Sequence, residues 1–251
     1  MKGAEPIFID KNSPVGILML HGFTSTPCQF KESADFLSDK GFTVYAPLLA
    51  GHGTSPEELM KTTPEDWTNS VLDGYLKLKQ KVEKVIVIGS SFGSNLAFWL
   101  AQKTANDLAG IISFSGPVFL RFQRFIMFRY HLYGRFKTYY HKPPWACQND
   151  KIKQVNEVLY SDIPIKSLKY FLDFMKDETI PNLSKVTVPV FISHAVADPI
   201  AHPKSADYIY SHIGSAVKEL YWFKSRLHTT ASDKVRDELF ARAYQFIKKI
   251  T

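Results

Sequence analysis

Residues 85–100 read VIVIGSSFGSNLAFWL, and this stretch decides the fold. Its branched apolar start predicts a short buried strand, and its apolar second half predicts a helix. Between them lies the G-x-S-x-G string Gly89-Ser90-Ser91-Phe92-Gly93. Glycines two positions before and after Ser91 suit a turn too sharp for larger side chains. We therefore predict a strand, a tight turn and a helix, with the Ser91 hydroxyl placed over the end of a sheet as a nucleophile.

A nucleophilic serine needs a base to take its proton and a third group to orient that base. Residues 188–193 and 217–223 predict two further strands; Asp198 follows the first and His228 follows the second. The carboxyl ends of the strands of an open α/β sheet share one edge. We therefore expect Ser91, Asp198 and His228 to converge there.

Other titratable residues fit these roles less well. His212 falls near the end of a predicted helix, and Asp207 lies inside the same helix, where we expect it to be solvated. His194 and His202 flank the loop of the candidate acid, where they either form local hydrogen bonds or shape the site. His52 lies between two glycines after another strand, and we expect it to be structural.

Acyl transfer also needs backbone N–H donors for the tetrahedral oxyanion. Phe92, directly after the nucleophile, is the expected first donor. Residues 16–20 predict a neighbouring strand that runs into His21-Gly22-Phe23. Gly22 lets the backbone bend close to the site, so Phe23 is the expected second donor.

The loop after Phe23 is expected to end on a helix. Thr26, Pro27 and Gln29 fit an N-cap, a first helical position and a capping-box partner. A loop held between a strand and a helix is rigid, as preorganised donors require.

Alternating strands and helices indicate an α/β fold with a mostly parallel central sheet flanked by helices. Residues 1–116 and 186–251 are expected to form this core, and residues 117–185 an inserted cap over the site. Strands are expected at 7–9, 15–20, 43–46, 85–88, 110–114, 188–193 and 217–223, and helices at 27–38, 64–81, 94–103, 203–213 and 233–249.

The insertion begins with an aromatic and basic stretch, residues 118–145, that contains no acid. Residues 151–175 are expected to form two amphipathic helices broken at Pro164. Apolar side chains facing Ser91 would form an acyl pocket, and outward basic side chains would contact anionic lipid headgroups. The alternative is that the aromatic side chains pack on the body and the cations are solvated.

The 251 residues suit one large α/β domain with an insertion. No apolar run reaches about 18 residues, and no apolar signal core opens the chain, so we expect no membrane span and a cytoplasmic location. Cys28 and Cys147 are isolated, so free thiols are expected, and no spacing indicates a metal or cofactor. The net charge of +7 comes mostly from the insertion without a nucleic-acid motif, so no nucleic-acid partner is expected.

The chain resembles the α/β-hydrolase fold and, more narrowly, the bacterial carboxylesterase and monoacylglycerol lipase group. This resemblance implies Ser91 as nucleophile, Asp198 and His228 as its partners, and the Phe23 and Phe92 amides as oxyanion hole. The pattern differs at Ser94, at His194-Ala195 and at residues 225–227. The matching residues are His21-Gly22-Phe23-Thr24, Ala46-Pro47, Gly51-His52-Gly53, Pro64-Glu65-Asp66-Trp67, Gly89 to Gly93, Asp198 and His228.

Together these features predict a serine esterase that needs no cofactor. Its expected substrates are short- or medium-chain carboxylic esters or monoacylglycerols. Another enzyme on the same triad remains open, such as an aromatic-acid esterase, a C–C hydrolase or an acyltransferase, because function resides in the pocket. A non-catalytic ligand-binding protein with a degenerate site is the other alternative. The oligomeric state is not indicated.

Overall fold

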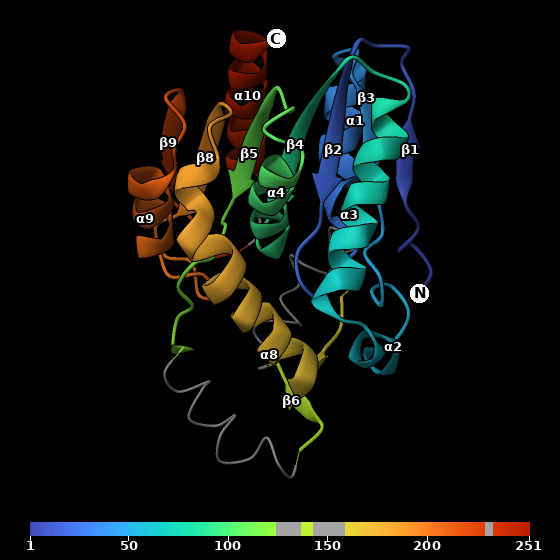
Figure 1. Cartoon of the computed structure of the whole chain (residues 1–251), viewed down its shortest axis with the longest axis vertical. Coiled ribbons are helices and arrows are strands. Elements are labelled where there is room, and N and C mark those ends of the chain that lie inside the picture. The colour runs from blue at the N-terminus through green and yellow to red at the C-terminus, as the bar shows by residue number, and fades with distance from the viewer. Residues whose placement is uncertain (124–136, 143–158, 229–232) are drawn as a thin grey trace.

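The computed structural model describes residues 1–123, 137–142, 159–228 and 233–251 (Figure 1). Cys147, most of the aromatic and basic stretch at 118–145, and residues 151–158 of the first of the two helices expected in 151–175 lie outside these residues. In the described part of the chain, no helix is long and apolar enough to cross a membrane.

Seven strands form one sheet in the order β1-β3-β2-β4-β5-β8-β9. All neighbouring pairs are parallel except β1 and β3, which are antiparallel. This confirms the predicted mostly parallel α/β sheet. The strands are β1 (Ile7–Ile9), β2 (Val15–Leu20), β3 (Thr43–Ala46), β4 (Lys84–Ser90), β5 (Gly110–Phe114), β8 (Val190–Ala195) and β9 (Lys218–Phe223).

Helices cover both faces of this sheet, as Figure 1 shows. Successive side chains of a strand point to opposite faces. Ile17 and Met19 of β2 therefore share a buried cluster with α1 (Lys31–Asp39) and α10 (Asp233–Ile250). Leu18 and Leu20 share the other cluster, with α3 (Pro64–Lys79), α4 (Phe92–Lys103) and α9 (Lys204–His212). The central strands are mostly apolar because both of their faces are buried.

The insertion contains a small antiparallel sheet of β6 (Tyr139–His141) and β7 (Asp162–Pro164), followed by α8 (Ile165–Asp173). A π-helical stretch (Phe174–Thr179) and a 3₁₀ helix (Ile180–Lys185) lead back to the sheet. The expected helix before Pro164 is wrong over residues 159–164, which include β7. Pro164 does mark the predicted break, since it lies directly before the first residue of α8.

Several boundaries differ from the expected ones. β8 begins at Val190 instead of residue 188, and the proline before it has no N–H to donate to a sheet ladder. β4 extends to Ser90 and α4 begins at Phe92, so Ser91 alone separates strand from helix. The turn is therefore tighter than expected, since the sequence predicts a strand that ends at residue 88 and a helix that begins at residue 94.

Candidate active site

The backbone of Ser91 makes the sharp turn that the sequence predicts. Its φ of 52° and ψ of −121° lie outside the common regions for a residue with a side chain. A Cβ at Gly89 would lie 2.4 Å from the Gly93 carbonyl oxygen, and one at Gly93 would lie 1.8 Å from the Leu20 carbonyl oxygen. Both positions therefore require glycine, and the predicted spacing has a steric cause.

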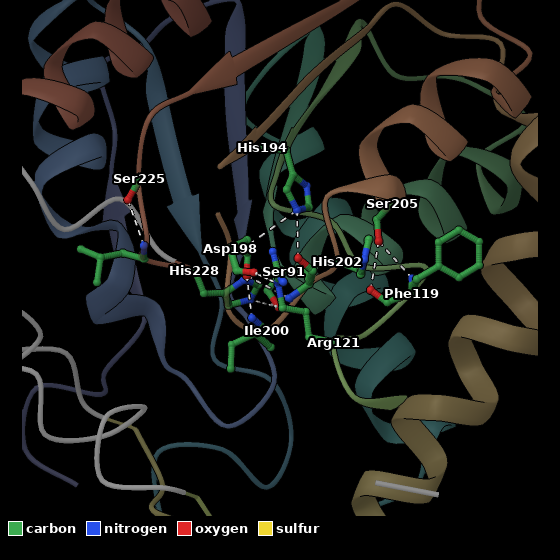
Figure 2. Close-up of polar contacts among 12 residues, drawn as sticks. Ser91, Phe119, Arg121, His194, Asp198, Ile200, His202, Ser205, Ser225 and His228 are labelled. Carbon is green, nitrogen blue, oxygen red and sulfur yellow. Dashed lines mark hydrogen bonds and ion pairs between the residues drawn. The ribbon is translucent and has the colours of Figure 1, made fainter. Parts of the chain in front are cut away.

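Ser91, His228 and Asp198 form a chain of hydrogen bonds (Figure 2). His228 Nε2 lies 2.8 Å from Ser91 Oγ, and His228 Nδ1 lies 2.8 Å from Asp198 Oδ2. These residues follow β4, β9 and β8, so the sheet edge brings together the three residues that the sequence proposed. The arrangement is that of a nucleophile, a base and an orienting acid.

Asp198 is fully buried, but its carboxylate accepts hydrogen bonds from the protein. Its Oδ1 accepts hydrogen bonds from the Ile200 and Ala201 amides at 2.8 and 2.9 Å. Burial raises the pKa of this carboxyl, but the charge and hydrogen bond of His228, together with His194 and the Ile200 amide, outweigh burial and hold the pKa below its usual value. Asp198 is thus kept as the anion that an imidazolium needs beside it.

A second imidazole, His194, lies against the same carboxylate. Its Nε2 is 3.6 Å from Asp198 Oδ2 and 3.3 Å from the Ala201 carbonyl oxygen. Burial lowers the pKa of His194, which favours the neutral ring. The sequence left open whether His194 forms a local hydrogen bond or shapes the site. In the structure it does both.

The loop after β2 approaches the nucleophile closely. A Cβ at Gly22 would lie 3.3 Å from Ser91 Cβ. Phe92 is the first residue of α4, so its N–H lies at the positive end of the helix. Within the described residues, neither the Phe23 nor the Phe92 amide donates a hydrogen bond. Both amides thus remain available for an oxyanion.

Aromatic side chains cover this loop. The Phe23 ring stacks on Phe171 of α8, with centroids 5.1 Å apart and planes 10° apart. Phe92 meets Phe171 and Phe174 edge to face at 5.2 and 5.4 Å, and Trp67 at 5.5 Å. The insertion is therefore packed directly on Phe23 and Phe92, the two residues expected to supply the oxyanion donors.

The family model described as serine aminopeptidase, S33 matches residues 13–235, and this match spans the turn, the acid and the base. The chain belongs to this family. A thermostable monoacylglycerol lipase of Bacillus sp. (strain H-257) is 31% identical to this S33-family chain over 99% of it and 96% of the relative. A carboxylesterase of Bacillus subtilis (strain 168) is 29% identical over 97% of this chain and 96% of the relative.

A solved structure from work on LipS and LipT, two metagenome-derived lipolytic enzymes, has a similar fold. It superposes on this S33-family chain with a TM-score of 0.88 and 27% identity, covering 99% of each chain. Together with the family match and the two curated relatives, it supports an ester-cleaving serine hydrolase of the α/β-hydrolase fold.

Three other histidines that the sequence set aside, His52, His202 and His212, are structural or make local contacts, as expected. His52 is buried, and its Nδ1 lies 3.1 Å from the Ala50 carbonyl oxygen. His212 is exposed at the end of α9 and stacks on Tyr208, and His202 Nδ1 accepts a hydrogen bond from the Lys204 amide. In the described part of the chain, no group of three or more His, Cys, Asp or Glu side chains is arranged so that it could hold a metal ion.

The departures from the family pattern are accommodated locally. Ser94 Oγ donates to the Gly89 carbonyl oxygen at 2.9 Å. Before His228, Ser225 accepts a hydrogen bond from the Leu227 amide at 3.0 Å through its Oγ, and one from the Ala197 amide at 3.2 Å through its carbonyl. The residues at 225–227 thus join the acid loop to the base loop.

Arg121 is a site residue that the sequence did not single out. Its Nε donates to the Asp198 carbonyl oxygen, and its amide donates to the Ile200 carbonyl oxygen at 2.8 Å (Figure 2). Ser205 Oγ accepts from the Phe119 amide at 3.0 Å. The start of the insertion is therefore fastened to the acid loop, a long-range contact that no local motif announces.

Proposed function

We propose that Ser91, His228 and Asp198 are the catalytic triad of this ester-cleaving serine hydrolase, and that monoacylglycerols and short- or medium-chain carboxylic esters are its substrates. The observation that carries the proposal is the pair of 2.8 Å hydrogen bonds that joins the Ser91 hydroxyl through His228 to a buried carboxylate. This geometry supplies a nucleophile and a general base in one motif.

In the first half-reaction, Ser91 Oγ attacks the ester carbonyl carbon while His228 Nε2 takes the hydroxyl proton. The Phe23 and Phe92 amides stabilise the negative charge on the former carbonyl oxygen. The C–O bond to the alcohol then breaks, and His228 returns the proton to the leaving oxygen. Asp198 holds the imidazole by Nδ1 and stabilises its cation, and the product is an ester on Ser91.

In the second half-reaction, His228 takes a proton from water, and the hydroxide attacks the acyl-enzyme. The tetrahedral intermediate collapses, Ser91 recovers its proton from His228, and the carboxylic acid leaves. Every proton moves between groups of this chain, water and substrate, so the scheme requires no cofactor.

The substrate class is proposed from the relatives and from the aromatic covering of the site. Residues 117–185 form the cap and the remaining residues the core in this proposal, with Phe171 and Phe174 above the oxyanion loop. Such apolar walls suit an acyl chain and exclude water. The cytoplasmic location stays a prediction of the sequence.

We also propose transient contact between the cap and anionic lipid. Phe122 is 73% exposed, next to Arg121 at the start of the insertion. Lys137 is also exposed. An exposed aromatic side chain and an exposed cation on one insertion suit the interface of an anionic membrane.

The decisive test compares Ser91→Ala with a matched control, Ser211→Ala on the exposed side of α9. We expect Ser91→Ala to lower the hydrolysis of monoacylglycerol and nitrophenyl esters by about a thousandfold or more, because it removes the attacking oxygen. A fluorophosphonate probe should label wild type and the control but not Ser91→Ala. Activity of Ser91→Ala above about one hundredth of wild type would contradict the proposal.

A panel of glyceryl, nitrophenyl and feruloyl esters, with an aminoacyl anilide for the aminopeptidase activity in the family's description, distinguishes the reactions open to this triad. We expect the highest kcat/KM for the glyceryl or nitrophenyl esters of medium chains. A higher kcat/KM for the feruloyl ester or the anilide would assign another substrate class to the same catalytic groups.

A further inference from the structure

Gln29 lies where the loop after β2 enters α1, in the 3₁₀ turn Pro27–Phe30. The expected capping box is absent there, because Thr26 forms no side-chain cap and the Gln29 side chain points elsewhere. Gln29 Oε1 accepts a hydrogen bond from the Gly22 amide at 3.1 Å. Gln29 Nε2 donates to Ser90 Oγ at 2.6 Å.

These two bonds join the segments that carry the proposed oxyanion donors. Gly22 directly precedes Phe23, and Ser90 stands two residues before Phe92. The parallel pairing of β2 with β4 ends at Leu20 and Gly89. Beyond that pair the sheet no longer sets the separation of the two segments, and the Gln29 amide group spans them.

The separation matters because both amides must aim at one oxygen. Oxyanion donors act at about 2.7–3.1 Å, and a misplacement of about 1 Å in a catalytic constellation can cost about a hundredfold in rate. Gly22 lies close to Ser91, since a Cβ there would be 3.3 Å from Ser91 Cβ, a tight contact. A bridge between the two segments would hold this close approach.

We propose that Gln29 is a positioning residue that sets the width of the oxyanion hole by bridging the Gly22 amide and the Ser90 hydroxyl. The inference rests on the proposed function, because it presupposes that the Phe23 and Phe92 amides bind the oxyanion. Gln29 touches no reacting atom and acts through the two loops. Its neutral amide offers one acceptor and one donor in the order that these partners require.

The test replaces Gln29 by methionine, which has a similar length but no comparable donor or acceptor. We expect Gln29→Met to lower kcat by about 10- to 100-fold with KM changed less than about threefold, because ground-state binding does not use the hole. Affinity for a trifluoromethyl ketone, which forms a tetrahedral adduct on the serine, should fall by the same factor as kcat. Gln102→Met on α4, whose amide bonds only its own helix, is the matched control and should match wild type.

Ser90→Ala removes the other end of the bridge and tests the same idea if Gln29→Met fails to fold. It should lower kcat and trifluoromethyl ketone affinity in parallel. The double variant should lose no more activity than Gln29→Met, because both changes break one bridge. A kcat of Gln29→Met and of Ser90→Ala within about twofold of wild type would overturn the inference, as would a loss of kcat without a matching loss of adduct affinity.

The failure of the proposed function is separately visible. If wild type were not labelled by the fluorophosphonate, or if Ser91→Ala stayed active, the assignment of the nucleophile would fall whatever Gln29 did. With a labelled, active wild type, the Gln29 and Ser90 variants test the bridge alone.

Discussion

His21 and His52 meet edge to face in the interior, with ring centroids 5.1 Å apart. His21 Nε2 accepts a hydrogen bond from the Leu49 amide at 3.1 Å, so this nitrogen carries no proton. Burial, with a smaller effect from the neighbouring His52, lowers the pKa of His21 to about 3. Burial also lowers the pKa of His52 to about 4. The fold therefore holds two imidazoles neutral directly before the oxyanion loop and beside it.

These lowered pKa values predict acid-sensitive stability. Between about pH 6.5 and pH 4 the unfolded chain protonates both histidines and the folded chain does not, so protonation favours unfolding. The free energy of unfolding, measured in urea, should keep its full value above pH 6.5 and fall as the pH drops below it. Each proton contributes a slope of up to about 1.4 kcal/mol per pH unit.

Variants assign this slope to the buried rings. His52→Gln should lower the slope of the free energy of unfolding against pH by the contribution of about one proton, because it removes one buried titrating group. The exposed histidine of α9 provides the control, and His212→Gln should leave the slope unchanged. An unchanged slope in His52→Gln would show that the acid sensitivity comes from other groups.

Sequence reasoning at this scale works where a role depends on nearby residues. Ser91 is identified by its two flanking glycines, and Asp198 and His228 by their places just after strands. Gln29 was misassigned, because its spacing to Thr26 fits a helix cap while its partner Ser90 lies 61 positions away in the chain. No local pattern distinguishes these two uses of a glutamine.

Among the elements, α4 fastens both ends of the insertion. Asn95 of this helix is fully buried, and its Nδ2 donates to the Pro117 carbonyl oxygen at 2.8 Å and to Thr179 Oγ1 at 3.2 Å. Pro117 stands where the insertion begins, and Thr179 lies in the segment that leads back to the core. The Asn95 side chain thus ties both the start and the end of the insertion to α4.

Asn95→Leu should lower the free energy of unfolding by about 2 kcal/mol, because it leaves the buried Pro117 carbonyl without its donor. Thr179→Val removes only the longer bond and should cost about 1 kcal/mol. Urea unfolding measures both effects. If Asn95→Leu were as stable as wild type, the proposed fastening would contribute nothing.

The distance along the chain over which an element is stabilised explains whether the sequence could predict it. Strands such as β2 and β4 follow from continuous apolar runs, and α8 from its amphipathic spacing. β7 escaped prediction because three residues in a two-stranded sheet carry little periodic signal, and its pairing with β6 depends on residues far away in the chain.

In the whole molecule, the described part of the insertion gathers past the carboxyl ends of the strands, and the far end of α10 lies at the opposite end (Figure 1). The described residues of the insertion contain more Lys and Arg than Asp and Glu, so this end of the molecule carries an excess of positive charge. A surface of this kind should meet an anionic membrane with the site facing the lipid.

Vesicle sedimentation tests this orientation. The protein should bind vesicles of phosphatidylglycerol and not of phosphatidylcholine, and salt should weaken the binding because it screens exposed charges. Lys137→Glu should weaken binding more than Lys248→Glu, which makes the same change of charge on α10 at the other end. Equal effects of the two variants would indicate attraction by net charge alone.

The strand order β2-β4-β5-β8-β9 spreads the groups of the proposed triad along the chain, with the His228 imidazole on the loop after β9. During synthesis, the hydroxyl and both amides emerge from the ribosome long before their proton acceptor does. A nascent polypeptide therefore passes through a stage in which the Ser91 turn is complete but the His228 imidazole has not yet been made. With the triad proposed above, hydrolysis would begin only after β9 and the loop that carries His228 have been made, so the order of translation would keep unfinished chains from cleaving esters.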